Sequence, residues 1–126
     1  MNPRALRAVA LLGAAGIVWL AGQRGAWGHA LLLDSLPRAD AAAPASLSRV
    51  VLRFNSSVEK SLSRLVVAGP DGRRFALRVA LDGAPDQLIA PIPTLAPGRY
   101  VLEWQVLSAD GHLTRGSFPF RFGRAP

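Results

Sequence analysis

Apolar side chains recur at every second position through much of this chain, which is the period of a β-strand with one buried face. The pattern is strongest in 99–107, where Tyr100, Leu102, Trp104 and Val106 fall on one face. After residue 28, no stretch carries the apolar stripe of an amphipathic helix. The sequence therefore restricts the folded part of the chain to the all-β class.

Turn-forming residues separate the alternating stretches. The runs Gly-Pro-Asp-Gly at 69–72 and Asp-Gly-Ala-Pro at 82–85, and the pair Pro97-Gly98, are strong turn signals. Short strands at regular spacing with such turns are typical of an antiparallel sandwich or barrel. The segments expected to form strands are 49–55, 64–68, 74–81, 87–92, 99–107 and 116–122.

The alternation also predicts the core and the less regular parts of the fold. Segment 87–92 is expected at a sheet edge or a bend, because Pro91 and Pro93 cannot donate ladder hydrogen bonds. The alanine-rich stretch 39–45 is expected to be a loop, because prolines bracket it. We expect the inward side chains to be Val50, Leu52, Phe54, Phe75, Leu77, Val79, Leu81, Tyr100, Leu102, Trp104, Val106, Phe118, Phe120 and Phe122.

The N-terminal segment has the features of a secretory signal. Two arginines precede an uninterrupted run of apolar and small residues over 8–22, which is shorter than the about 20 residues that a transmembrane helix needs. Ala26 and Gly28 then stand where signal peptidase accepts small residues. We therefore expect 1–28 to be a signal peptide and 29–126 to be one exported, soluble domain. An uncleaved membrane anchor is the alternative.

Composition limits the chemistry available to this domain. The chain has no cysteine and its single methionine is the first residue, so 29–126 offers no sulfur ligand and no thiolate nucleophile. The net charge of +7 becomes +4 without residues 1–28, because 12 basic residues then face 8 acidic ones. The arginines are scattered along the expected strands, whereas nucleic-acid-binding proteins concentrate them on one element with stacking aromatics. We therefore expect no nucleic-acid partner.

Signal cleavage at the expected site would make His29 the first residue, with a free α-amino group that can chelate a metal ion together with the imidazole. The only other histidine, His112, follows Asp110 by two residues in Ser-Ala-Asp-Gly-His at 108–112. Residues two apart share a strand face, and Gly111 allows a bend that brings both side chains together. The resulting three nitrogens and one oxygen suit one Cu(II) ion in square-planar or tetragonal coordination, with Zn(II) as a weaker alternative.

Several parts of the chain resemble the periplasmic copper-resistance CopC family. His-Ala-Leu at 29–31 with Ser-Leu-Pro-Arg-Ala at 35–39 is similar to the start of its members, and Leu-Arg-Phe-Asn at 52–55 to an early core strand. The run Tyr-Val-Leu-Glu-Trp-Gln-Val-Leu-Ser-Ala-Asp-Gly-His at 100–112, followed by Gly-Ser-Phe-Pro-Phe at 116–120, resembles its C-terminal signature. The resemblance implies an immunoglobulin-like or cupredoxin-like antiparallel β-sandwich, a Greek-key barrel.

The same resemblance implies a tight Cu(II) site that maps onto His29, Asp110 and His112. Two departures from the family pattern bear on this site. Many members carry a supporting glutamate where this chain has Ser56, and Glu59 stands three residues further on. Some members also have a methionine-rich Cu(I) site, which a domain without methionine cannot form.

These features lead to the hypothesis of a periplasmic protein, not an enzyme, that sequesters or carries one Cu(II) ion in copper resistance or homeostasis. The resemblance implies transfer to an inner-membrane copper transport protein of the CopD type. One alternative is a metal-free immunoglobulin-like interaction module. The other is a histidine-brace copper oxidase, which is less favoured because Asp110 would occupy a position that such an enzyme keeps open. Ser35, Ser108 and Ser117 have no base partner beyond the two histidines, which argues against a hydrolase.

Overall fold

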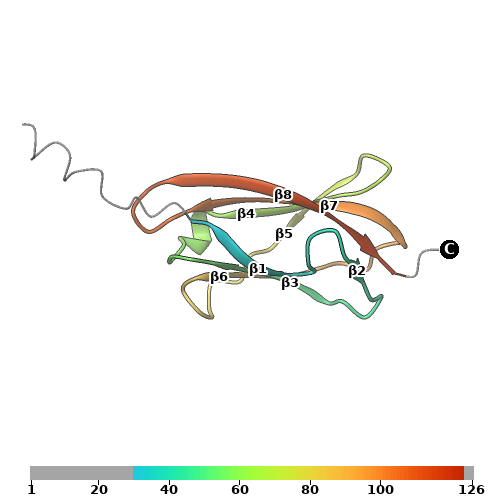
Figure 1. Ribbon diagram of the computed structural model, residues 1–126, viewed down its shortest axis with the longest axis horizontal. Helices are drawn as coiled ribbons and strands as arrows, with labels where there is room; N and C mark the ends of the chain where they lie inside the picture. The colour runs from blue at the N-terminus through green and yellow to red at the C-terminus, as the bar shows by residue number, and fades with distance from the viewer. Residues whose placement is uncertain (1–29, 124–126) are drawn as a thin grey trace, which may run out of the picture.

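The computed structural model describes residues 30–123 (Figure 1), so the expected signal peptide 1–28, His29 and residues 124–126 lie outside the described part. Within it, the chain forms eight strands and one short 3-10 helix, η1 (Lys60–Leu62). The strands are β1 (Leu32–Leu36), β2 (Ala42–Ala43), β3 (Arg49–Phe54), β4 (Arg64–Ala68), β5 (Arg74–Leu77), β6 (Gln87–Pro91), β7 (Gly98–Leu107) and β8 (Leu113–Phe122). No helix of this described part is long and apolar enough to cross a membrane.

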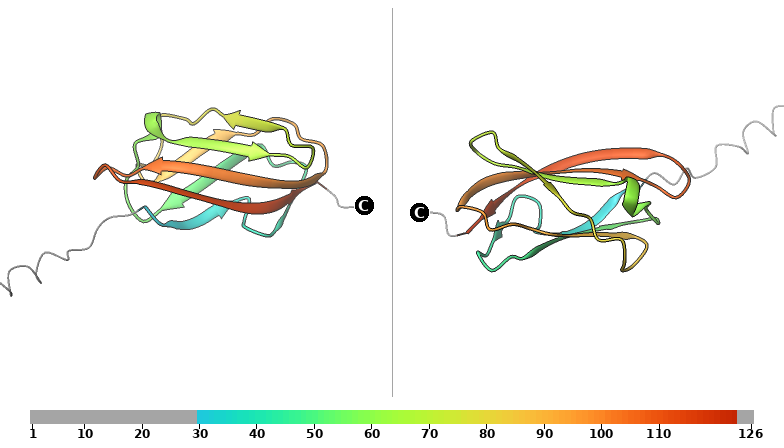
Figure 2. Two further views of the ribbon diagram at one scale, coloured as in Figure 1. Left: turned by 90° about the horizontal axis from the view of Figure 1, so that it is seen from above. Right: turned by 180° about the vertical axis from the view of Figure 1, so that it is seen from behind.

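The strands form two stacked sheets. Three of them pair in the order β1-β3-β6, and the other five in the order β2-β8-β7-β4-β5. Every pairing is antiparallel except the short contact between β2 and β8. Figure 1 shows the two layers from the side, and Figure 2 shows the five-stranded sheet in front of the three-stranded one. The predicted all-β antiparallel sandwich is confirmed.

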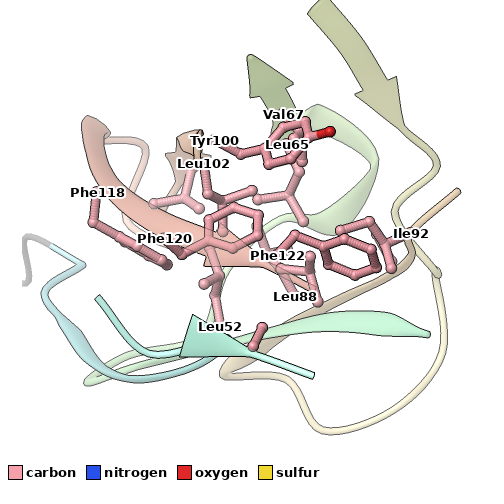
Figure 3. Packing of buried hydrophobic residues seen from close by; sticks show 14 of the residues in the cluster. Leu52, Leu65, Val67, Leu88, Ile92, Tyr100, Leu102, Phe118, Phe120 and Phe122 are labelled. Atoms are coloured by element: carbon pink, nitrogen blue, oxygen red, sulfur yellow. The ribbon is translucent and has the colours of Figure 1, made fainter. Parts of the chain in front are cut away.

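The core lies between the two sheets, where apolar side chains from both layers meet (Figure 3). The ring centroids of Phe54 and Trp104, which come from different sheets, are 5.3 Å apart edge to face. Those of Tyr100 and Phe120, on the neighbouring strands β7 and β8, are 5.9 Å apart and stacked. Burial of each large apolar side chain contributes about 1.5–3 kcal/mol. This core stabilises a domain without disulfides.

One close approach in the five-stranded sheet requires a glycine. Trp104 of β7 is paired with Gly116 of β8. A Cβ added at Gly116 would lie 2.2 Å from a ring atom of Trp104, which no real contact allows. The indole therefore packs against the β8 backbone where a side chain would otherwise stand.

The prediction of a strand over 74–81 is wrong in its second half. β5 ends at Leu77, which is paired with Leu65 near the start of β4, so little of β4 remains to pair with the following residues. The chain instead crosses to the other sheet, where the Ala80 N–H donates to the Ile89 carbonyl (2.8 Å). Leu81, predicted to be inward, is 72% exposed.

Other boundaries differ less. β8 begins at Leu113, three residues before the predicted start of this strand, and β2 lies inside the predicted loop 39–45. β1 was not predicted, because its leucines are consecutive and do not alternate, and a bulge between Leu32 and Asp34 shifts its register. The prediction that 87–92 lies at an edge is confirmed, because β6 is the last strand of its sheet.

Candidate metal site

The hairpin between β7 and β8 carries the Ser-Ala-Asp-Gly-His motif in its loop. Gly111 has a φ of +90°, a conformation that side-chain-bearing residues rarely adopt, and this reverses the chain within five residues. The loop is closed by backbone hydrogen bonds from the Ser108 N–H to the His112 carbonyl and from the Gly111 N–H to the Ser108 carbonyl, both 2.9 Å. The predicted bend at Gly111 is confirmed.

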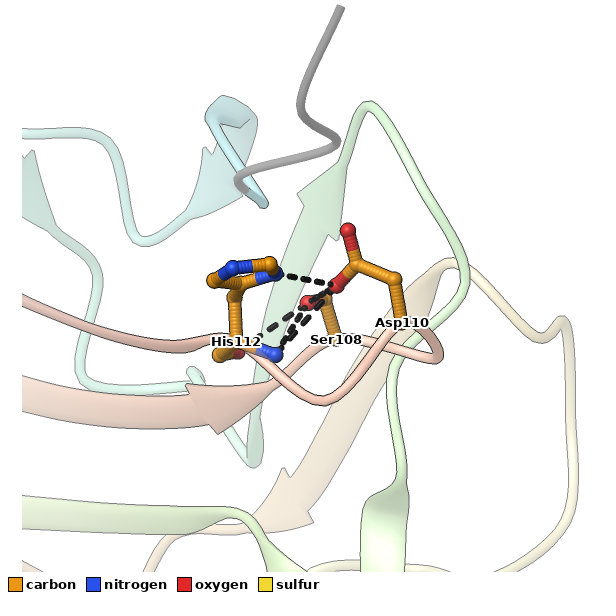
Figure 4. A network of polar contacts seen from close by, with 3 residues as sticks. All are labelled: Ser108, Asp110 and His112. Atoms are coloured by element: carbon orange, nitrogen blue, oxygen red, sulfur yellow. Dashed lines mark hydrogen bonds and ion pairs between the residues drawn. The ribbon is translucent and has the colours of Figure 1, made fainter.

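A buried serine hydroxyl holds the polar groups of this loop together (Figure 4). Ser108 is only 1% exposed. Its Oγ donates to Oδ1 of Asp110 and accepts from the His112 N–H at 3.2 Å. The His112 N–H also approaches Asp110 Oδ1 at 3.3 Å. These hydrogen bonds lower the pKa of Asp110 to about 2, and the bond from Ser108 has the largest effect, followed by those from His112. The carboxylate is therefore charged at neutral pH.

The two predicted donors of the loop face each other. Oδ1 of Asp110 lies 3.1 Å from Nδ1 of His112, and the side chains are 39% and 41% exposed, so an ion can reach them from solvent. With metal–ligand bonds of about 2.0–2.1 Å, as in zinc sites, two ligands at a right angle are about 2.9 Å apart. The observed separation therefore fits two adjacent positions around one ion.

The described start of the chain is held at the same end of the sandwich (Figures 1 and 2). The Leu31 N–H donates to Oδ1 of Asn55 at 2.8 Å, and the Asn55 N–H donates back to the Leu31 carbonyl at 3.0 Å. Two residues further on, the carbonyl of Ser57 accepts from the N–H of Ala109 in the hairpin loop at 3.0 Å. Segment 55–57 thus links the chain start to the loop, and Ala30 is fully buried.

Three other residues that the sequence analysis related to the metal site are not part of the Asp110–His112 pair. His29 lies outside the described residues, and no group of three or more His, Asp or Glu side chains that could hold a metal ion occurs within 30–123. Ser56 has a buried Oγ without a hydrogen-bond partner in the described part. Glu59 is exposed and immediately precedes η1 as its N-cap residue.

Sequence reasoning missed two residues. Ser108 was considered only as a nucleophile, although a serine two residues before an aspartate is typical of a turn in which its hydroxyl binds nearby groups. Asn55 is the last residue of the predicted strand 49–55, and nothing in the sequence indicates that its side chain binds the backbone of Leu31.

The fold and the donor pair define a class of small β-sandwich proteins with a candidate metal-binding hairpin beside the start of the chain. The model of the CopC domain matches residues 32–123. Protein YobA of Escherichia coli (strain K12) is 35% identical over 97 residues, which cover 75% of this chain and 78% of YobA. The chain belongs to the CopC domain family.

Solved structures and a second curated relative agree with this assignment. CopC from Methylosinus trichosporium OB3b superposes with a TM-score of 0.67 at 32% identity, covering 75% of this chain and 94% of that protein. PcoC, a methionine-rich copper resistance protein from Escherichia coli, has a TM-score of 0.63 at 25% identity, covering 75% and 99%. Copper transport protein CutJ of Bacillus subtilis (strain 168) is 27% identical over 100 residues, which are 77% of this chain and 18% of CutJ.

Proposed function

We propose that this chain is an exported, periplasmic protein that binds one Cu(II) ion through His29, Asp110 and His112 and sequesters or carries it in copper resistance or homeostasis. The family supports a role in copper handling, because PcoC is a copper resistance protein and CutJ a copper transport protein. The protein holds its cargo and catalyses no covalent step.

The observation that carries the proposal is the separation of 3.1 Å between Asp110 Oδ1 and His112 Nδ1. The carboxylate is already ionised and held by Ser108, so binding an ion does not require it to lose a proton or to search for its position. Such preorganisation reduces the conformational entropy that binding costs. A charged oxygen and an imidazole are ligands that Cu(II) accepts well.

The chain start supplies the remaining donors in this proposal. His29 is two residues before Leu31 in the sequence, and the backbone of Leu31 is anchored to Asn55. The α-amine and imidazole of a terminal His29 would complete a set of three nitrogens and one oxygen. No sulfur ligand is available in 29–126, so the same site would hold Cu(I) poorly.

Transfer of the ion to a membrane protein of the CopD type is part of the proposal. It is supported by CutJ, in which a stretch similar to this chain makes up 18% of a copper transport protein. An exposed site at the end of the sandwich suits such a transfer, because a second set of ligands can approach the ion before the first set releases it.

The decisive experiment compares two N-termini. Mass analysis of the exported protein establishes whether His29 is the first residue, and Cu(II) titration then compares this protein with a form that carries one extra glycine before His29. We expect tight one-to-one binding that the extra residue abolishes. Equal, weak binding in both forms would overturn the proposal and favour the metal-free interaction module. Copper-dependent oxygen consumption with a reductant would favour the oxidase.

A further inference from the structure

The strand register places five arginines on the outer face of the five-stranded sheet, although they are scattered in the sequence. In an antiparallel sheet, paired residues point to the same face. Arg99 of β7 is paired with Arg121 of β8, and Gln105 of β7 is paired with Arg115 on one side and Arg64 on the other. Arg74 of β5 is paired with Ala68 on the same face. All five arginines are exposed.

Few acidic groups balance this arginine face, defined by Arg64, Arg74, Arg99, Arg115 and Arg121. Within the described residues, its one ion pair joins Arg74 to Glu103, whose carboxylate accepts from both terminal nitrogens of the guanidinium. Asp40 lies at the edge, lining a hollow together with Arg99 and Arg121. Five arginines against these two acids leave a net charge of +3. An open hollow of about 570 Å³ lies between Arg64, Arg74 and Arg115.

The outer face of the three-stranded sheet is different. Its outward charged residues are Arg49, Arg53 and Asp34, and the exposed Arg38 lines a hollow there together with Asp34 and Arg53, so three arginines against one acid give a net charge of +2. Arg53 lies opposite Asp34 in the strand pairing. Leu36 and Val51 are paired with each other on the same face. The five-stranded face therefore carries more arginines and the larger net positive charge, although the sequence indicated only a diffuse basic surface.

The placement of two of these arginines is unfavourable for the fold. Arg99 and Arg121 stand directly opposite each other, and like charges in that position destabilise a sheet. Guanidinium groups bind phosphate through paired N–H donors, so a broad array of them complements a plane of phosphates. Figure 2 shows that no other described element covers this face.

We propose that the arginine face docks onto the phosphate headgroups of an anionic membrane. A lipid surface fits better than a nucleic acid, because the described outward positions of the face carry no aromatic ring on which bases could stack. The face runs along β7 and β8, whereas the hairpin loop lies at their end, so docking leaves Asp110 and His112 open. The inference does not depend on copper binding.

The test measures partitioning of residues 29–126 onto lipid vesicles by sedimentation. This part contains the complete described sandwich with its own core, and it lacks the apolar run 8–22, which would bind any vesicle. Vesicles of phosphatidylethanolamine with phosphatidylglycerol are compared with vesicles of phosphatidylethanolamine with phosphatidylcholine. We expect binding to the anionic vesicles only, weakening as salt is added, because the Debye length is about 10 Å at 0.1 M salt.

Two double variants that remove equal charge locate the binding face. Arg99→Gln with Arg121→Gln is expected to weaken binding about 25-fold, since each arginine near an anionic surface contributes about fivefold. Arg49→Gln with Arg53→Gln is the control on the opposite face, and it is expected to change binding less than about twofold, because that face lies about a Debye length or more from the lipid. Circular dichroism verifies that both variants fold.

Several results would overturn the inference. Equal losses in the two double variants would mean that net charge alone drives binding. No binding to the anionic vesicles would exclude a lipid partner, and tighter, Arg99-dependent binding to a short DNA duplex would replace it with a nucleic acid. Copper affinity is expected to be the same in both variants, so failure of this inference is separate from failure of the copper site.

Discussion

The hairpin loop and the arginine face use polar groups in opposite ways. In the loop, Ser108, Asp110 and His112 are tied to one another within five residues around a buried hydroxyl. On the arginine face, charges from four strands stand apart, and within the described residues one ion pair joins them to an acid. A site built on mutual hydrogen bonds depends on every member, whereas a surface that acts by summed charge tolerates the loss of one. Single substitutions should therefore have large effects in the loop and small ones on the face.

The largest effect is expected from His112→Ala. It removes a proposed copper ligand, and because the loss of an outer partner of a ligand alone costs about 10–100-fold in metal affinity, we expect a loss of more than about 100-fold. Competition with a Cu(II) chelator measures the affinity. Ser117→Ala, an exposed change on β8, is the matched control and should bind copper normally. Tight copper binding by His112→Ala would show that the loop imidazole is not a ligand.

Substitutions at two glycines test the stability of the sheet and the geometry of the loop separately. Gly116→Ala places a Cβ 2.2 Å from the Trp104 ring, and we expect the free energy of unfolding to fall by about 1–3 kcal/mol. Copper affinity of the folded variant should not change. Urea unfolding followed by tryptophan fluorescence measures the first quantity, and chelator competition the second.

Gly111→Ala is the counterpart in the loop. No atom lies within 4 Å of the added Cβ, so the cost comes from the φ of +90° and amounts to about 1–2 kcal/mol. Because this strain falls between Asp110 and His112, copper affinity should decrease here and not in Gly116→Ala. The opposite distribution between the two variants would contradict the division between sheet and loop.

Ser108→Ala tests whether the buried hydroxyl organises the donor pair. It removes the hydrogen bond that contributes most to lowering the Asp110 pKa to about 2, so this pKa should rise toward its ordinary value of 3.8, as a carboxyl-detected NMR titration would show. We expect copper affinity to fall about tenfold. An unchanged Asp110 pKa would contradict this role for the hydroxyl.

The same pKa predicts a direction for acid stability. A carboxylate whose pKa is lower in the folded state stabilises the fold above its ordinary pKa and loses that contribution as the pH falls from about 4 to about 2. Ser108→Ala should therefore lose less stability over this window than the unmodified protein. Copper binding is expected to weaken as the pH falls, because protons compete with the metal ion for its ligands.

The smallest effect is expected on the arginine face. Arg99→Gln relieves the repulsion from Arg121, so the free energy of unfolding should rise by about 0.2–0.5 kcal/mol at low salt and by less at high salt. Arg53→Gln removes an arginine that lies opposite Asp34 in the strand pairing, so it should not raise the free energy of unfolding. A loss of stability in Arg99→Gln would mean that the face contributes to the fold.

These two regions also show what a sequence can predict. The alternation in 99–107 and the phenylalanines of β8 predicted the central strands and the core, because burial of one strand face enforces the period of two. The loop was predictable because its members are within five residues of one another. The arginine face was not, because it depends on the register between β4, β7 and β8. The end of β5 was not predicted for the same reason, because it is set by pairing with β4 and not by the local sequence pattern.

In the proposed site, one Cu(II) ion joins the chain start to the hairpin loop. Pulsed EPR of the copper-loaded exported protein, compared with His112→Ala, tests it most directly by counting coupled imidazoles. We expect couplings from both histidines in the unmodified protein and from one in the variant. A single imidazole in both proteins would place the ion on the terminal residue alone and contradict the proposed site.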